Sequence, residues 1–301
     1  MVHETSFEQF ADLLARDYAI KGRKTASVLP RRIVHLRPHF EKLAASEISY
    51  DAMTRYISAR MDEGAAPATI QHELACLGRM LTLAVRSRRL PVKPPVPTIK
   101  LQNARTGFFE TEDVERVAQF LPECIAAVVR FAYPTGWRRS EVLGLEWRCV
   151  DATAVRLESG TTKNGEGRLF PFTESLRELL GVRRARCSEL ERATSSVIPL
   201  VFTWEDGGPI KCFRRAWESA LARAGLPGRI FHDLRRSAVR RLVRAGVSET
   251  VAMRLSGHKT RAIFDRYNIV DEGNPEDAAQ KLNEYLKQRK KQGATKLRRV
   301  K

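Results

Sequence analysis

The feature that most constrains the fold is a proline-rich stretch near residue 95. Four prolines fall within the last seven residues of the run Leu90-Pro91-Val92-Lys93-Pro94-Pro95-Val96-Pro97. Clustered prolines cannot continue a helix, and they favour an extended, semi-rigid segment. A chain of 301 residues is long enough for about two domains. We therefore expect a first domain over residues 1–95, a linker over 96–105 and a second domain over 106–301.

The first hundred residues show the apolar period of amphipathic helices. Two apolar stripes recur at helical spacing, one of Phe7, Phe10, Leu13, Leu14 and Tyr18, and one of Ile70, Leu74, Leu77, Leu81 and Val85. They predict a small helical bundle. Four arginines near the end of the second stripe are suited to DNA phosphates: Arg79, Arg86, Arg88 and Arg89. A solvated charged face is an equally good interpretation of any one of them.

The charge of the chain indicates a polyanionic partner. With 53 basic and 35 acidic residues the net charge is +18, of which residues 1–105 contribute +7 and residues 287–301 contribute +8. Such a field attracts nucleic acid, although a basic surface can also serve solubility alone. No apolar run is long enough to span a bilayer, and five cysteines without a C-x-x-C pair indicate reduced thiols. We expect a cytoplasmic protein.

The second domain is predicted to be mainly α with one small antiparallel sheet. Thr111 begins a helix, and later helices are expected over 231–245 and 248–256. Between them, residues 154–158 and 168–172 flank the turn signal Lys163-Asn164-Gly165, which predicts a hairpin with Lys163 near its tip.

The residues suited to chemistry come in short motifs in this domain. They are Thr135-Gly136-Trp137-Arg138 with Glu141, the hairpin Lys163, His232-Asp233-Leu234-Arg235, Gly257-His258, and Tyr267 nine residues later. Taken singly, each has an ordinary structural interpretation. Taken together and in order, Arg138, Lys163, His232, Arg235, His258 and Tyr267 resemble the active-site signature of the tyrosine recombinases, the phage integrase family.

This resemblance covers nearly the whole chain. It implies a helical core-binding (SAM-like) domain over residues 1–95 and a catalytic domain over 106–301 that ends in a helix and a basic tail. The implied activity is site-specific cutting and rejoining of DNA, for integration or excision of a mobile element. The chain is most similar in motif to mobile-element integrases, and no arm-binding domain is expected before its core-binding helices.

The resemblance also implies how the DNA phosphodiester bond would be broken. Tyr267 would attack the scissile phosphate to give a 3′-phosphotyrosine and a free 5′-hydroxyl. Lys163 would protonate the departing 5′-oxygen, and His232 would accept the tyrosine proton. Because tyrosine has an ordinary pKa of about 10, a surrounding field of cations would promote its attack.

Phosphate binding would depend on the remaining groups. Arg138 and Arg235 would clamp the non-bridging oxygens and His258 would donate to the phosphate, with Glu141 supporting Arg138. The ester is exchanged rather than hydrolysed, so neither a metal nor a nucleotide cofactor is expected. Residues 160–165 are followed by Glu166 rather than by the lysine of a phosphate loop.

The expected partner is double-stranded DNA with inverted-repeat core sites, bound by a homotetramer on paired sites. An accessory DNA-bending or directionality factor belongs to the same expectation. Residues 276–290 are predicted to form a final helix that packs on a neighbouring protomer, with packing in cis as the alternative. Two other functions stay open: relaxation of DNA by a type IB topoisomerase-like activity, and DNA binding without cutting.

Overall fold

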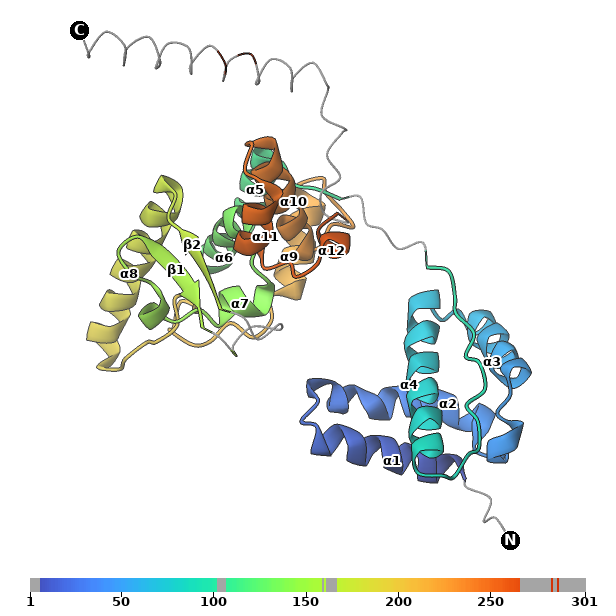
Figure 1. The fold of residues 1–301 in the computed structure, drawn as a ribbon. Coiled ribbons are helices and arrows are strands. Elements are labelled where there is room, and N and C mark those ends of the chain that lie inside the picture. Colours follow the sequence, from blue (N-terminus) through green and yellow to red (C-terminus); the bar gives the residue numbers. More distant parts are fainter. Residues whose placement is uncertain are drawn as a thin grey trace, which may run out of the picture. The chain divides into compact units, whose positions relative to one another are not determined.

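The computed structural model describes residues 6–101, 107–158, 160, 167–265, 283 and 286 (Figure 1). The chain divides into two compact units, residues 1–103 and 104–301. This division lies inside the predicted linker over 96–105. In the part of the chain that the structure describes, no helix has both the length and the apolarity needed to cross a membrane.

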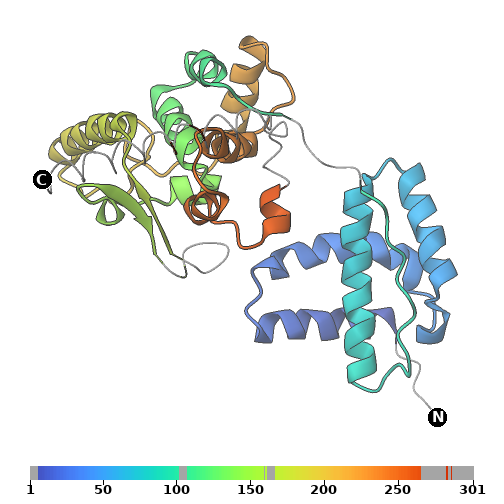
Figure 2. The ribbon, with the colours of Figure 1, turned by 45° about the horizontal axis from the view of Figure 1, so that its top comes forward.

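In its described part, unit 1, residues 1–103, has only helices as regular secondary structure, and the chain after Arg86 is irregular. Its elements are α1 (Phe7–Ile20), η1 (Lys24–Val28), α2 (Leu29–Phe40), η2 (Ala45–Glu47), α3 (Tyr50–Asp62) and α4 (Pro67–Arg86). Helix α4 packs against α1, α2 and α3 (Figures 1 and 2). Both predicted apolar stripes contribute to one core, in which Phe7, Phe10, Ile70 and Leu77 are fully buried.

The proline-rich stretch packs on unit 1. Helix α4 ends at Arg86, and Arg88 adopts a left-handed φ of 57°. Leu90 is buried, Val96 and Ile99 pack against the same core, and the Ile99 backbone N–H donates to Gln71 Oε1 at 2.7 Å. Residues 96–99 therefore belong to the packing of unit 1, although the proline pattern places them in the linker.

Unit 2, residues 104–301, combines helices with one hairpin. Its described elements are α5 (Thr111–Ala118), α6 (Glu123–Thr135), α7 (Arg139–Leu143), η3 (Trp147–Cys149), β1 (Ala154–Leu157), β2 (Arg168–Pro171), α8 (Glu174–Thr194), α9 (Arg214–Arg223), α10 (His232–Arg244), α11 (Glu249–Ser256) and α12 (Arg261–Asp265). Helix α6 is buried on nearly all sides, because α5, α7, α8 and α10 pack around it. Figure 2 shows α8 alongside the hairpin.

The hairpin is antiparallel, as predicted. Val155 pairs with Phe170, and Leu157 pairs with Arg168. Val155, Leu157 and Phe170 point into the core of unit 2. The predicted turn, with Lys163, lies outside the described residues.

Candidate functional site

The site begins where α6 ends. Gly136 terminates α6 with a φ of +63°, and a Cβ at this position would lie 2.9 Å from the Ala238 Cβ of α10. Glycine is therefore required both for the left-handed turn and for the close approach of α10. The turn places Arg138 at the N-cap of α7.

Glu141 holds Arg138 in place. Its carboxylate accepts from the Arg138 backbone N–H and from Arg138 Nη1, both at 2.8 Å. The Glu141 side chain is 3% exposed, whereas that of Arg138 is 22% exposed. A buried carboxylate thus orients a guanidinium that still reaches the surface.

Arg235 joins the start of α10 to the end of α11. It is 2% exposed, and its Nη1 donates to the Gly136 carbonyl oxygen at 2.7 Å. Its Nη2 lies 3.2 Å from His258 Nε2. The structure therefore brings Arg235 and His258 together although they are 23 residues apart.

The hydrogen bonds of His258 define its tautomer. The Ser256 hydroxyl donates to the Ala252 carbonyl oxygen at 2.6 Å, so Ser256 Oγ accepts from His258 Nδ1 at 2.7 Å. Arg235 Nη2 lies 3.5 Å from Nδ1 and 3.2 Å from Nε2, and with the proton on Nδ1 only Nε2 can accept from it. In this state the ring is neutral, with its proton on Nδ1.

The surroundings of both histidines of the site lower the pKa of the imidazole and so favour its neutral form. Burial, followed by the charges of Arg235, Arg138 and Arg168, lowers the pKa of His258 to about 3. Partial desolvation and then the charge of Arg235 also lower the pKa of His232, the more exposed of the two rings. Each ring responds to Arg138 as well as to Arg235. Four of the six predicted catalytic residues therefore lie within one electrostatic environment.

Two residues of this site were missed by the sequence analysis, Arg168 and Ser256. Arg168 forms an ion pair with Glu141, and its Nη1 donates to the Ser256 carbonyl oxygen at 2.7 Å. A sequence signal for Arg168 exists, because it shares a strand face with the buried Phe170 and a charge on the inward face is unusual. Nothing in the local pattern marks Ser256.

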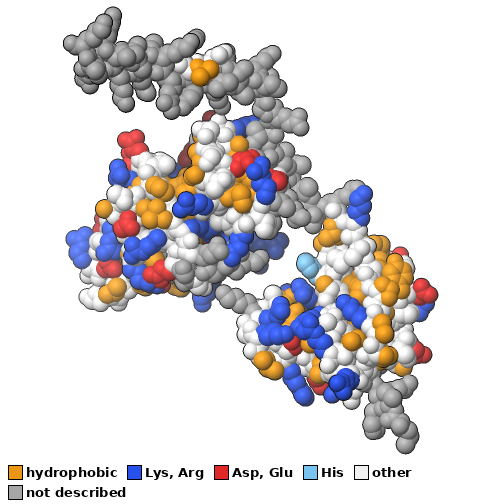
Figure 3. Space-filling model, in the orientation of Figure 1, with side chains coloured by type: hydrophobic (Ala, Val, Ile, Leu, Met, Phe, Trp, Pro, Cys, Tyr) orange, Lys and Arg blue, Asp and Glu red, His pale blue; other side chains and the backbone are white. Residues whose placement is uncertain are grey.

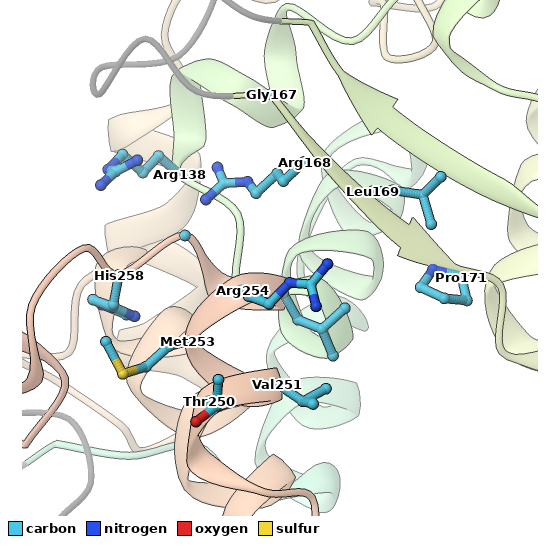
Figure 4. Close-up of a pocket in the computed structure, with 12 residues that line it drawn as sticks. Arg138, Gly167, Arg168, Leu169, Pro171, Thr250, Val251, Met253, Arg254 and His258 are labelled. Carbon is cyan, nitrogen blue, oxygen red and sulfur yellow. The ribbon is translucent and has the colours of Figure 1, made fainter.

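A cavity of about 810 Å³ adjoins these groups. Arg138, Arg168 and His258 line it together with residues of β2 and α11, including Leu169, Thr250 and Met253. In Figure 4 the guanidinium groups of Arg138 and Arg168 lie on one side, and His258 and α11 lie across from them. Clustered guanidinium groups beside a cavity are suited to bind a tetrahedral anion such as phosphate.

Lys163 and Tyr267, the predicted acid and nucleophile, lie outside the described residues. The described part of the chain resumes at Gly167, after Lys163, and runs to Asp265 in α12, before Tyr267. Among the residues that the structure describes, no group of three or more His, Cys, Asp or Glu side chains is arranged to hold a metal ion.

The four arginines predicted to contact DNA in unit 1 differ in their surroundings. Arg79 binds Asp17 of α1 at 2.9 Å, so its guanidinium joins two helices. Arg86, Arg88 and Arg89 are exposed, and the last two lie beyond the end of α4 because the chain turns at Arg88.

A second cationic region of unit 1 was not predicted. Figure 3 shows Lys and Arg side chains gathered where α1 and α2 meet. A groove of about 300 Å³ contains Arg31, Arg32 and His35 of α2 and His72 of α4. Arg31, Arg32 and His35 lie within one helical turn of α2, and this spacing is the sequence signal that could have indicated the cationic region.

Comparison with known proteins identifies relatives of the chain. The profile of the phage integrase family matches residues 108–273. The integrase of Salmonella phage P22 is 27% identical over 219 residues, which are 67% of this chain and 54% of that protein. The chain thus spans about half the length of this relative.

Solved structures show the same fold. A lambda integrase tetramer bound to a Holliday junction aligns with a TM-score of 0.70 at 15% identity, covering 90% of this chain and 80% of that one. The Tn1549 transposon integrase in complex with a circular intermediate DNA aligns with a TM-score of 0.70 at 14% identity, covering 90% and 98%.

Proposed function

Because this chain belongs to the phage integrase family, we propose that it is a site-specific DNA recombinase that integrates or excises a mobile element. It acts on DNA in the cytoplasm and conserves bond energy through a 3′-phosphotyrosine. The observation that carries the proposal is the gathering of Arg138, Arg235 and His258, where Arg235 Nη2 lies 3.2 Å from His258 Nε2 and both arginines lower the pKa of His258. These are the groups that a pentacoordinate phosphorane requires.

The reaction exchanges one ester for another. The Tyr267 hydroxyl oxygen attacks the scissile phosphorus, His232 accepts its proton, and the bond to the 5′-oxygen breaks as Lys163 supplies a proton to that oxygen. Arg138 and Arg235 bind the non-bridging oxygens throughout. The lowered pKa of His232 favours the neutral imidazole, which is the form that accepts a proton.

His258 changes its hydrogen bonding when phosphate binds. In the free protein its Nε2 accepts from Arg235 Nη2. The oxygens of a bound phosphate attract the Arg235 guanidinium, so that it no longer donates to His258 Nε2. The negative charge of the phosphate also raises the pKa of the imidazole. His258 then takes up a proton and donates to the phosphate. In the free protein, burial of the imidazole and then the charge of Arg235 disfavour this protonation by lowering the pKa of His258.

The assembly is a homotetramer on paired inverted-repeat core sites, aided by an accessory DNA-bending or directionality factor. The lambda integrase relative was solved as a tetramer on a Holliday junction, which supports this assembly. The predicted final helix, residues 276–290, lies outside the described residues except for Asn283 and Leu286. Leu286 is 48% exposed, which leaves an apolar side chain for a neighbouring protomer. Exposed Arg86, Arg88 and Arg89 contribute phosphate contacts from unit 1.

Covalent capture tests the function. Wild type and Tyr267→Phe are incubated in excess EDTA with nicked, fragmented DNA from the source cell and its mobile elements. The nicks let the 5′-hydroxyl strand diffuse away, so the covalent intermediate accumulates. After denaturation, the DNA that remains attached to protein is sequenced. We expect one inverted-repeat site, attached at its 3′ end, with wild type only.

The other outcomes identify the alternatives. Attachment dispersed over many sequences would indicate a topoisomerase-like activity. Tight binding without attachment would indicate a DNA-binding protein that does not cut. Attachment that requires a divalent ion would contradict the metal-free mechanism.

A further inference from the structure

Arg168 occupies a central position that the reaction described above does not use. It is the first residue of β2, directly after the hairpin turn, and its side chain is 7% exposed. Its guanidinium lies over the Trp137 ring, 5.6 Å from the centroid. The buried Nε–H meets no hydrogen-bond acceptor among the described residues. Arginine side chains are rarely buried unless they are paired, so the contacts of Arg168 are the feature to explain.

The contacts of Arg168 join three elements of the site. Its Nη2 binds Glu141 of α7, the carboxylate that also holds Arg138. Its Nη1 donates to the Ser256 carbonyl oxygen at the end of α11, two residues before His258. The planar Arg168 guanidinium therefore connects β2 to Arg138, through Glu141, and to the end of α11 beside His258. Arg138 and His258 both face the cavity (Figure 4).

Gly257 provides the space that the Arg168 guanidinium needs. Its φ is +70°, and a Cβ at this position would lie 1.8 Å from Arg168 Nη1. Any other residue would displace the guanidinium from the Ser256 carbonyl. The glycine of the Gly257-His258 motif thus serves Arg168 as well as the turn that ends α11.

We propose that Arg168 is a positioning residue for the phosphate site, acting through Glu141 on Arg138 and through the end of α11 on His258. Glu141 accepts from both guanidinium groups, so Arg168 neutralises part of the carboxylate charge and leaves more of the Arg138 charge available to a phosphate. Without Arg168, Arg138 is the remaining cation bound to this buried carboxylate among the described residues and is drawn toward it. The inference rests on the proposed recombinase function, which it extends by one residue.

The first test compares two substrates. Strand cleavage in a single turnover is measured on the duplex recovered by covalent capture, and on the same duplex with a methylphosphonate at the scissile position. The methyl group replaces a charged non-bridging oxygen, so cleavage depends less on the arginine clamp. The variants are Arg168→Met, Arg168→Lys, Arg138→Ala and, as the matched control, Arg156→Met, which removes an exposed arginine from the neighbouring strand β1.

We expect Arg168→Met to reduce cleavage of the phosphate duplex by about 10²-fold, the loss typical of a displacement of about 1 Å. DNA affinity should stay unchanged. On the methylphosphonate duplex its rate should match wild type, as should that of Arg138→Ala. Arg168→Lys keeps the charge in the same space, and it should show the same pattern with a smaller loss. An unchanged rate on phosphate, or an equal loss on both duplexes, would overturn the proposal.

A second measurement does not depend on catalysis. The His258 imidazole is titrated by NMR in the free protein, with His258→Asn used to assign its resonance. Arg168 lies near His258 together with Arg235, Arg138 and His232. Arg168→Met should raise the pKa of His258, whereas Arg156→Met should not. If wild type cleaves no DNA, the recombinase function fails while this titration still decides the role of Arg168: an unchanged His258 would refute it.

Discussion

At the residue scale, Gly257 shows how one missing Cβ serves two purposes. Gly257 and Gly246 both follow helix ends in unit 2 with similar left-handed angles, φ +70° and φ +77°. A Cβ at Gly246 meets nothing within 4 Å, whereas one at Gly257 meets the Arg168 guanidinium. A substitution at Gly246 therefore tests backbone strain alone, whereas one at Gly257 tests backbone strain together with displacement of the Arg168 guanidinium.

We predict that Gly257→Ala destabilises the protein more than Gly246→Ala. Gly246→Ala should lower the free energy of unfolding by about 1 kcal/mol, because alanine is strained at a positive φ. Gly257→Ala adds the displacement of Arg168 and should cost more. Urea unfolding followed by tryptophan fluorescence measures both, since Trp137, Trp147, Trp204 and Trp217 all belong to unit 2. Equal losses would show that Arg168 moves aside without cost.

The neutral state of His258 links folding to pH. Its pKa is about 3 in the folded protein and about 6.5 when unfolded. The unfolded chain therefore binds a proton between these values while the folded chain does not, so the stability is fully present above about pH 6.5 and falls with pH. We predict that the stability difference between wild type and His258→Asn decreases by up to about 1.4 kcal/mol per pH unit as the pH falls from 6.5.

Urea unfolding of both proteins at several pH values checks this prediction. Other groups that titrate in acid affect wild type and variant alike, so the difference isolates His258. Parallel stability curves would show that the imidazole is as easily protonated in the folded state as in the unfolded one.

At the element scale, a buried polar network joins α3 and α4 of unit 1. Glu73 of α4 is 2% exposed and accepts from Tyr56 at 2.6 Å and from Arg60 at 3.3 Å, both on α3. Arg60 also pairs with Glu63, whose side chain is 52% exposed. The two carboxylates thus contact the same arginine in different surroundings.

We predict that Glu73→Ala destabilises unit 1 by about 3 kcal/mol, because it leaves a buried cation without its buried partner. Glu63→Ala, the matched control, should cost less than about 1 kcal/mol because its pair is solvent-exposed. Hydrogen exchange of α3 and α4 amides in the full chain measures both changes. Similar effects of the two variants would show that the buried pair contributes no more than the exposed one.

At the scale of the whole molecule, assembly and electrostatic affinity depend on different parts of the C-terminal region. Residues 276–290 carry the predicted helix, and residues 291–301 carry five further basic residues. Ending the chain after 274 removes both, and ending it after 290 removes only the second.

We predict that the chain 1–274 binds a single DNA site but does not form the tetramer on paired sites. The chain 1–290 should form the tetramer, with a weaker salt dependence of DNA affinity because fewer cations displace counterions. Light scattering of the purified complexes shows whether the tetramer forms. DNA binding at several salt concentrations gives the salt dependence of the affinity. An unaltered tetramer from 1–274 would place the final helix in cis.

The sequence by itself indicated the two-unit plan, the helical stripes and the hairpin. It also predicted the type and order of the catalytic groups, which stay a prediction. Each of these depends on local spacing: a period of 3.6, a proline cluster, a turn signal, or a short motif. Gly257 could be predicted in this way because a left-handed helix end favours glycine in the sequence.

Only the tertiary structure decided which side chains share a partner. Arg235 meets the Gly136 carbonyl across 99 residues, and Arg168 meets the Ser256 carbonyl across 88. Arg79, one of the four arginines suited to DNA phosphates, binds Asp17 across 62 residues. Such contacts arise from the packing of elements that are distant in the chain, and local periodicity carries no record of them. The proposed role of Arg168 rests on such contacts, whereas the tautomer of His258 rests on the local bonds of Ser256 at the end of α11.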